Sequence, residues 1–239
     1  MFLLLACTAP VVDSADSADS AEVDTVSISG LVYAFKSRDF LAGATVGLHE
    51  HPELTTVSAD DGTWSFEGLD AGETVTPWFE LDGYRAASHR SFTLEADQER
   101  VYFQAIPTAV YDLMFQALVN AGVTIDPEAC HVASTVTDPT MNDITTWAEF
   151  DAFIPHGLAG ATVSTSAPDI TPIYFNEDVF PDPSRTETSI DGGIILPNLP
   201  AGGFTFTGAG GGYTYDELSA VCAPGRFVNA SPPWGVRAR

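Results

Sequence analysis

Apolar and polar residues alternate with a period of two along much of the first half of the chain, starting near Val26. Successive side chains of a strand point to opposite faces, so this pattern predicts strands with one buried face. Pairs such as Asp61-Gly62 and Asp82-Gly83 separate the runs and favour tight turns. The runs are Ser27–Tyr33, Gly43–Leu48, Thr55–Ala59, Thr63–Phe66, Thr74–Glu80, Ser91–Leu94 and Val101–Phe103. Short strands at this spacing predict a β-sandwich.

The period changes between Thr108 and Ala121. Apolar residues recur there at helical spacing, at Val110, Leu113, Met114, Ala117, Leu118 and Ala121. Thr108 is suited to cap the start of a helix and Gly122 to end it. We therefore expect one short amphipathic helix within a linker of residues 107–128, with its apolar stripe as a packing face.

The second half of the chain repeats motifs of the first. The matched segments are Gly43–Val46 with Gly160–Val163, Asp61-Gly62 with Asp191-Gly192, Leu69–Gly72 with Leu199–Gly202, and Gly83-Tyr84 with Gly212-Tyr213. The first two pairs are offset by 117 and 130 positions, so the second copy carries an insertion of 13 residues. Prolines place this insertion in a loop near residues 164–186. The repeat predicts two tandem antiparallel sandwiches, over residues 26–106 and 129–239.

These motifs resemble those of carboxypeptidase regulatory-like domains, which are transthyretin-like or immunoglobulin-like β-sandwiches. The matching segments of the first copy are Gly30–Val32, Gly43–Val46, Val57–Phe66, Leu69–Gly72 and Gly83-Tyr84. The second copy matches more loosely, with Ile194 and Leu196 in place of the hairpin aromatics. The resemblance implies an all-β fold and an accessory role without catalysis, because such modules stabilise, space or present other domains. Some relatives bind carbohydrate.

The first seven residues are almost wholly apolar and end at Cys7. Leu4–Cys7 resembles the lipobox of bacterial lipoproteins, which implies that residues 1–7 form a signal segment and that Cys7 is acylated after cleavage. Residues 8–25 repeat Ser-Ala-Asp, and such small and acidic residues predict a disordered tether. Thr8, in the position after the cysteine, favours the outer membrane by the same resemblance. The chain is then expected in the cell envelope, lipid-anchored to the outer membrane or cell surface.

The net charge of the chain limits the kinds of partner that it can bind. Nine basic residues oppose 33 acidic ones, for a net charge of −24. This field repels phosphate backbones, so nucleic acid is not expected as a partner. The expected partners are a membrane, reached through the lipid, and a carbohydrate or surface protein.

The three cysteines indicate one disulfide. If Cys7 carries lipid, Cys130 and Cys222 remain to pair in an oxidising compartment. Cys130 precedes the first strand of the second domain and Cys222 lies near its last. First and last strands of a sandwich can be neighbours, so we predict a Cys130–Cys222 bridge.

The leading hypothesis is a non-catalytic surface lipoprotein with sandwich modules for adhesion, binding or envelope architecture, and no cofactor is expected. The sequence has neither a Gly-x-Ser-x-Gly elbow nor a His-Glu-x-x-His motif.

Two alternatives stay open. The first is a carbohydrate-binding module in which Trp78, Trp147 and Trp234 stack on sugars, although Trp234 could equally be a hydrophobic plug. The second is a metal-dependent enzyme. His49–His51 is the densest group of metal ligands, since its two histidines would share one face of a strand, but no third ligand is near in sequence.

Overall fold

The computed structural model describes residues 24–239, which are mostly β-strand with three short helices. The strands of the first half are β1 (Thr25–Ala34), β2 (Thr45–Leu48), β3 (Thr55–Val57), β4 (Thr63–Asp70), β5 (Thr74–Val75), β6 (Pro77–Glu80), β7 (Ala87–Ser88), β8 (Phe92–Thr93) and β9 (Gln98–Ala105). Those of the second half are β10 (Cys130–Thr137), β11 (Ala161–Thr165), β12 (Ile173–Phe175), β13 (Pro181–Asp182), β14 (Gly193–Leu199), β15 (Gly202–Gly210), β16 (Leu218–Cys222), β17 (Phe227–Asn229) and β18 (Val236–Arg237). The helices are α1 (Thr108–Asn120), η1 (Pro139–Asp143) and α2 (Trp147–Ala152). In this described part, no helix has the length and apolarity to cross a membrane.

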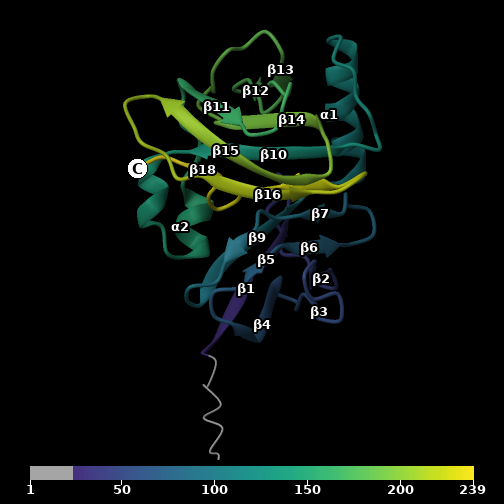
Figure 1. Ribbon diagram of the computed structural model, residues 1–239, viewed down its shortest axis with the longest axis vertical. Helices are drawn as coiled ribbons and strands as arrows, with labels where there is room; N and C mark the ends of the chain where they lie inside the picture. The colour runs from purple at the N-terminus through teal and green to yellow at the C-terminus, as the bar shows by residue number, and fades with distance from the viewer. Residues whose placement is uncertain (1–23) are drawn as a thin grey trace, which may run out of the picture.

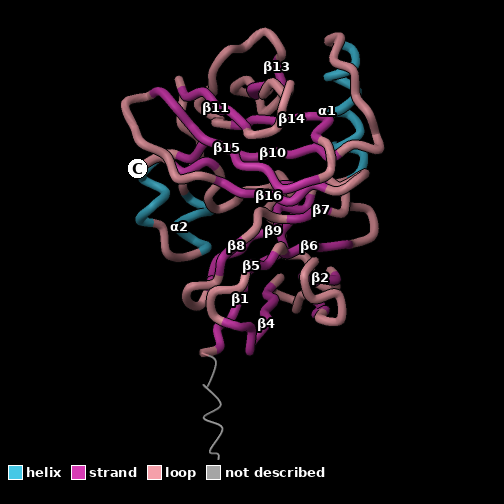
Figure 2. Tube along the Cα trace, in the orientation of Figure 1, coloured by secondary structure: helices cyan, strands magenta, loops and turns pink. Residues whose placement is uncertain are grey.

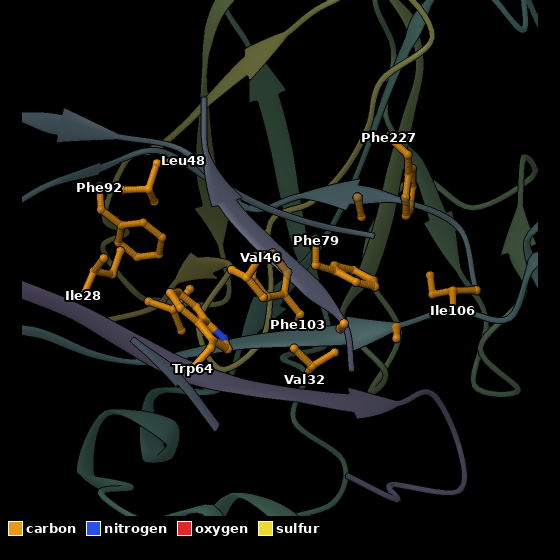
Figure 3. Close-up of a cluster of buried hydrophobic side chains, with 14 of the residues drawn as sticks. Ile28, Val32, Val46, Leu48, Trp64, Phe79, Phe92, Phe103, Ile106 and Phe227 are labelled. Atoms are coloured by element: carbon orange, nitrogen blue, oxygen red, sulfur yellow. The ribbon is translucent and has the colours of Figure 1, made fainter. Parts of the chain in front are cut away.

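The first half folds as two layers that enclose one core (Figure 1). Strands β4-β1-β9 form one sheet, and β3-β2-β6-β7 form the other. The alternation along β4 buries Trp64 and Phe66 and exposes their neighbours, as its period of two requires. Figure 3 shows the core side chains, among them Ile28, Val32, Val46, Leu48, Trp64, Phe79 and Phe103. Trp64 lies in this core, with 4% of the residue exposed.

The second half has the same two layers. Strands β12-β14-β10-β17 lie in one sheet, with β18 also paired to β10, and β11-β15-β16 form the facing sheet. The core between them includes Val132, Val163, Ile194, Leu196, Phe206 and Leu218. Ile194 and Leu196 thus fill places that aromatic residues hold in the first half.

The two halves share a sheet, a feature that the sequence did not predict. Val228 of β17 pairs in parallel with Ser88 of β7, so a single ten-stranded sheet runs through both. Figure 2 shows β7 beneath the strands of the second half. The Arg85 guanidinium donates to the Gly225 carbonyl at 2.8 Å across the same junction. The expected tandem arrangement is therefore fused edge to edge.

The buried imidazole of His89 adds a second link across this junction. Its Nδ1 accepts the Arg90 backbone N–H at 2.9 Å, so the proton of the neutral ring lies on Nε2, which donates to the Pro232 carbonyl at 3.0 Å. Burial lowers the pKa of His89 to about 3. The ring is therefore neutral at ordinary pH, with both nitrogens satisfied.

The repeat seen in the sequence has a counterpart in the hydrogen bonds. In the first half, the Ser58 hydroxyl accepts from the Ala44 N–H at 2.9 Å and donates to the Leu41 carbonyl at 2.7 Å. In the second half, the Thr188 hydroxyl makes the same pair of bonds, to the Ala161 N–H at 2.9 Å and the Leu158 carbonyl at 2.6 Å. We call this arrangement the hydroxyl clamp; it ties a strand start to the loop before it.

Equivalent bonds also locate two insertions in the second half. The Val32 N–H donates to Gly62, and the Val136 N–H donates to Gly192, each at 2.8 Å. Val32 and Val136 lie 104 positions apart, whereas the clamp residues Ser58 and Thr188 lie 130 apart. The first insertion precedes β11 and contains η1 and α2, and the second follows β11 and contains β12 and β13. The sequence had placed one insertion, as a loop.

Two expectations about strand pairing were wrong. The sandwiches are not purely antiparallel, because β1 pairs in parallel with β9 and β10 pairs in parallel with β17. The Asp61-Gly62 turn does not close a hairpin, since β3 before it pairs with β2 and β4 after it pairs with β1. Gly62 has a φ of 75°, as its turn position requires. The chain crosses from one layer to the other at this turn.

Helix α1 matches the expected range but differs in its details. Pro107, not Thr108, is its N-cap, and no side chain caps it. The buried stripe is Tyr111, Phe115 and Leu118, whereas the predicted Leu113 is 59% exposed. Tyr111 and Phe115 turn inward because their rings pack on Phe227 and His131, which come from the second half of the chain.

Candidate functional site

The structure contains the predicted disulfide between Cys130 and Cys222, with Cα atoms 5.5 Å apart. Cys130 begins β10 and Cys222 ends β16, so the bridge joins the two facing sheets of the second half. The prediction had rested on first and last strands of a sandwich being neighbours, without saying whether they share a sheet. Cys7 and most of the predicted tether lie outside the described residues. Only its last two residues, Asp24 and Thr25, are described, and Thr25 is the first residue of β1.

His49, Glu50 and His51 do not converge on one point. His49 Nε2 lies 2.8 Å from the Ser88 hydroxyl, and the Glu50 carboxylate accepts from the Thr76 N–H at 2.6 Å. His51 Nε2 lies 2.8 Å from a carboxylate oxygen of Glu73, which raises the pKa of His51. Each side chain therefore has a partner of its own. Within residues 24–239, no three potential ligands lie together as a metal site would need.

The three candidate tryptophans lie in different settings, and each is half-buried. Trp78 packs over Gly47, where a side chain would collide with its indole ring. Trp234 donates its indole N–H to the Met141 carbonyl at 3.1 Å and is stacked under the Arg100 and Arg237 guanidinium groups. Trp78 and Trp234 thus each pack against neighbouring residues, and Trp147 is the one of the three that lines a groove.

Trp147 lines an open groove of about 550 Å³ on the outer face of the β4-β1-β9 sheet. Helix α2 holds it there, with its ring 4.7 Å from that of Tyr33 and 5.4 Å from that of Tyr102. The helix starts with a capping box, in which Thr146 accepts from the Glu149 N–H and Glu149 accepts from the Thr146 N–H. The Thr146–Glu149 spacing is a sequence signal that could have located α2.

Hydroxyl groups line the floor of this groove. Ser29 of β1 faces Ser65 of β4, and Leu31 faces Thr63. The groove is also lined by Thr56, Val57, Glu99, Arg100 and Tyr102. The Arg100 guanidinium is already engaged, since it donates to the Ile144 carbonyl and stacks 4.7 Å from Trp234. The groove therefore offers the aromatic rings of Trp147 and Tyr102, hydroxyl donors and acceptors, one carboxylate and some apolar surface, a set that suits an uncharged ligand with polar groups.

No family model matches the chain, and no curated protein does. Among solved structures, the TIE protein of Bacillus anthracis overlaps with a TM-score of 0.30 at 12% identity, over 90% of this chain and 34% of that protein, so this chain spans about a third of its length. The shaft pilin of Lactobacillus rhamnosus GG gives 0.26 at 11% identity, over 90% of this chain and 97% of the pilin. The minor pilin of Streptococcus agalactiae gives 0.27 at 10% identity, over 89% and 95%. TM-scores and identities this low do not indicate a function, so the function is inferred from the geometry of the chain itself.

Proposed function

We propose that this chain is a non-catalytic protein displayed outside the cytoplasm, anchored through a lipid on Cys7, in which two fused sandwiches form a stiff unit. The Cys130–Cys222 disulfide carries the proposal, because such bonds persist in oxidising compartments. The shared ten-stranded sheet supports the mechanical part, since a bend between the halves would break the β7–β17 pairing. A stiff unit on a polar tether presents its far end away from the membrane.

Expression in a Gram-negative host tests the display. The full chain and a Cys7→Ala variant are grown with an alkyne-labelled fatty acid and then treated with protease on intact cells. We expect the parent chain to carry the label and to be cleaved from outside, and the variant to lose the label and leave the membrane. A Thr8→Ala variant is the matched control and should keep the label. An unlabelled, protease-protected parent chain would refute the proposal.

Carbohydrate binding at the Trp147 groove is a second candidate function. The aromatic ring beside a hydroxyl-lined floor favours it, since sugars stack on aromatic faces and exchange hydrogen bonds with hydroxyl groups. A glycan array with the parent chain tests it. Ser65→Arg fills the groove from an exposed position and should abolish any signal, whereas Thr74→Arg, exposed on β5, should not. Silence of the parent chain across the array would end this candidate.

A further inference from the structure

A separate cleft of about 390 Å³ lies where the two halves meet α1. We call it the junction cleft. Its floor is the shared sheet, with Thr135 and Asn229, and its walls are α1, the loop after β1 and the loop that joins β12 to β13. Cavities of roughly 300–1,000 Å³ are the size that holds small ligands. Neither the anchor nor the Trp147 groove involves this cleft.

Exposed apolar side chains gather around the junction cleft. In the described part of the chain, nine large apolar residues are exposed, and four of them line this cleft: Leu113, Ile154, Phe180 and Ile190. They come from α1 and from segments before β11, β13 and β14. Distant segments would not converge on one opening by the ordinary scatter of surface apolar residues. The rim therefore favours a ligand with an apolar body.

Basic groups lie at the same opening. Lys36 is the sole lysine of the chain, and it lines the cleft together with Arg38. Arg38 is bound to Asp151 at 2.6 Å, but within residues 24–239 Lys36 forms no ion pair. The Lys36 Nζ atom lies instead 5.5 Å from the ring centre of Phe35 and 6.0 Å from that of Phe180. The chain has 33 acidic residues, yet among the described residues no carboxylate oxygen lies within 4.0 Å of the Lys36 ammonium group.

The backbone around the cleft is strained. Six non-glycine residues of the described chain have positive φ, and three of them line this cleft: Lys36 at 71°, Arg38 at 62° and Val179 at 65°. Positive φ is a strong departure for a β-branched residue such as Val179. Strain of this kind persists where the surroundings fix it, and it concentrates at ligand sites.

The other titratable groups at the cleft each have a partner within the protein. Glu177 pairs with Arg185 at 3.3 Å. Asp191 accepts from the Gly193 N–H, and burial raises the pKa of Asp191 to about 6. His156 binds the Phe150 carbonyl, and burial lowers the pKa of His156. Among the described residues that line the cleft, Lys36 is therefore the cation that forms no salt bridge. The acids elsewhere act weakly, because salt screens charges beyond about 8 Å at physiological ionic strength.

We propose that the junction cleft binds a small amphiphilic carboxylate, with its apolar body between α1 and the β12–β13 loop and its carboxylate at Lys36. The cleft volume, the apolar rim and the unpaired ammonium group each select one part of this ligand. A cationic amphiphile has the same apolar body but would place its charge against Lys36.

Calorimetric titration of the full chain at pH 5.5 tests the proposal with octanoate, octan-1-ol and octylamine. We expect octanoate to bind and octylamine to bind at least about tenfold more weakly, since a charge-assisted hydrogen bond would be replaced by repulsion. Lys36→Met should weaken octanoate binding about tenfold and leave octan-1-ol binding unchanged. Arg239→Gln, which removes a cation from a surface pair with Asp216, should leave both unchanged.

A pair of variants on α1 separates this cleft from other surfaces. Leu113→Glu adds a carboxylate to the rim and should abolish octanoate binding. Val119→Glu adds the same group on the same helix, at a residue that is 47% exposed and does not line the cleft, and should not. Thermal melts check that both variants are folded. No octanoate binding at millimolar concentration, equal binding of octylamine, or binding insensitive to Leu113→Glu would each overturn the proposal. None of these results depends on lipidation or display.

Discussion

Asp61 and Asp191 occupy the same turn in the two halves of the molecule, yet their pKa values shift in opposite directions. Asp61 is exposed and accepts the Thr63 hydroxyl and N–H, which lowers its pKa. Gly193 stands at the position equivalent to Thr63, and a side chain there would collide with Asp191 and with the Phe175 ring. Burial consequently raises the pKa of Asp191 to about 6.

Phe175 belongs to β12, which lies in the second insertion. The turn that carries Asp191 is therefore packed beside a segment that has no counterpart in the first half. The insertions also line the clefts. The first insertion supplies Trp147 to the groove and Ile154 to the junction cleft, and the second supplies Phe180. The two-layer sandwich is common to both halves, and the two insertions are what makes the second half different.

The disulfide is the largest expected difference in stability, because within residues 24–239 only the second half contains one. Replacing both Cys130 and Cys222 by Ala should lower the free energy of unfolding by about 4 kcal/mol, since the bond closes a loop of 92 residues. Urea unfolding followed by tryptophan fluorescence measures this loss of stability.

The same unfolding curve tests the shared sheet. Because β7 and β17 pair, the parent chain should unfold in one transition. Two separate transitions would show that the shared sheet does not couple the halves.

The Asp191 carboxyl should make stability depend on pH. Its pKa is about 6 in the folded chain, against 3.8 for an aspartate in an unfolded chain, so the folded state holds the proton more tightly. Stability is then full below about pH 4 and falls as the pH rises through 6. Asp191→Asn should raise the free energy of unfolding by about 3 kcal/mol at pH 7 and leave it unchanged at pH 3.5.

The matched change Asp61→Asn tests the comparison from the other side. The folded pKa of Asp61 is lowered, so its contribution is present at neutral pH and is lost in acid. Asp61→Asn should therefore lower stability slightly at pH 7. If Asp191→Asn and Asp61→Asn both raised the free energy of unfolding at pH 7, the opposite pKa shifts of the two aspartates would not explain the effects of these variants on stability.

The hydroxyl clamp should contribute similarly in both halves. Ser58→Ala and Thr188→Val each remove one hydroxyl and leave two backbone groups without a partner, so each should cost about 2 kcal/mol. The exchanges Ser58→Thr and Thr188→Ser keep the hydroxyl and should cost less than about 1 kcal/mol. Chemical denaturation measures all four. If only one of Ser58→Ala and Thr188→Val lowered the free energy of unfolding, the same hydrogen-bond geometry would not contribute equally to stability in the two halves.

The sequence predicted the features that local chemistry determines. Alternation located most strands, and glycines such as Gly43 and Gly160, both with positive φ, marked the repeat. It missed the β7–β17 pairing, because nothing in a two-residue strand such as Ala87-Ser88 specifies a partner 140 positions away. It also missed the junction cleft. Leu113 fits a helical packing stripe, and its exposure follows from where Tyr111 and Phe115 find partners.

The smallest expected effect compares the two α-helices. Helix α2 begins with a capping box, whereas α1 has no side-chain cap. Thr146→Ala should therefore cost about 1 kcal/mol, and Thr108→Ala, at the start of α1, should cost nothing measurable. Because α2 holds Trp147 and Phe150 against Tyr33, hydrogen exchange should quicken in α2 and in the face of β1 that it covers. Unchanged exchange in β1 would mean that this helix packs on the first half without stabilising it, and the insertion would then serve the groove alone.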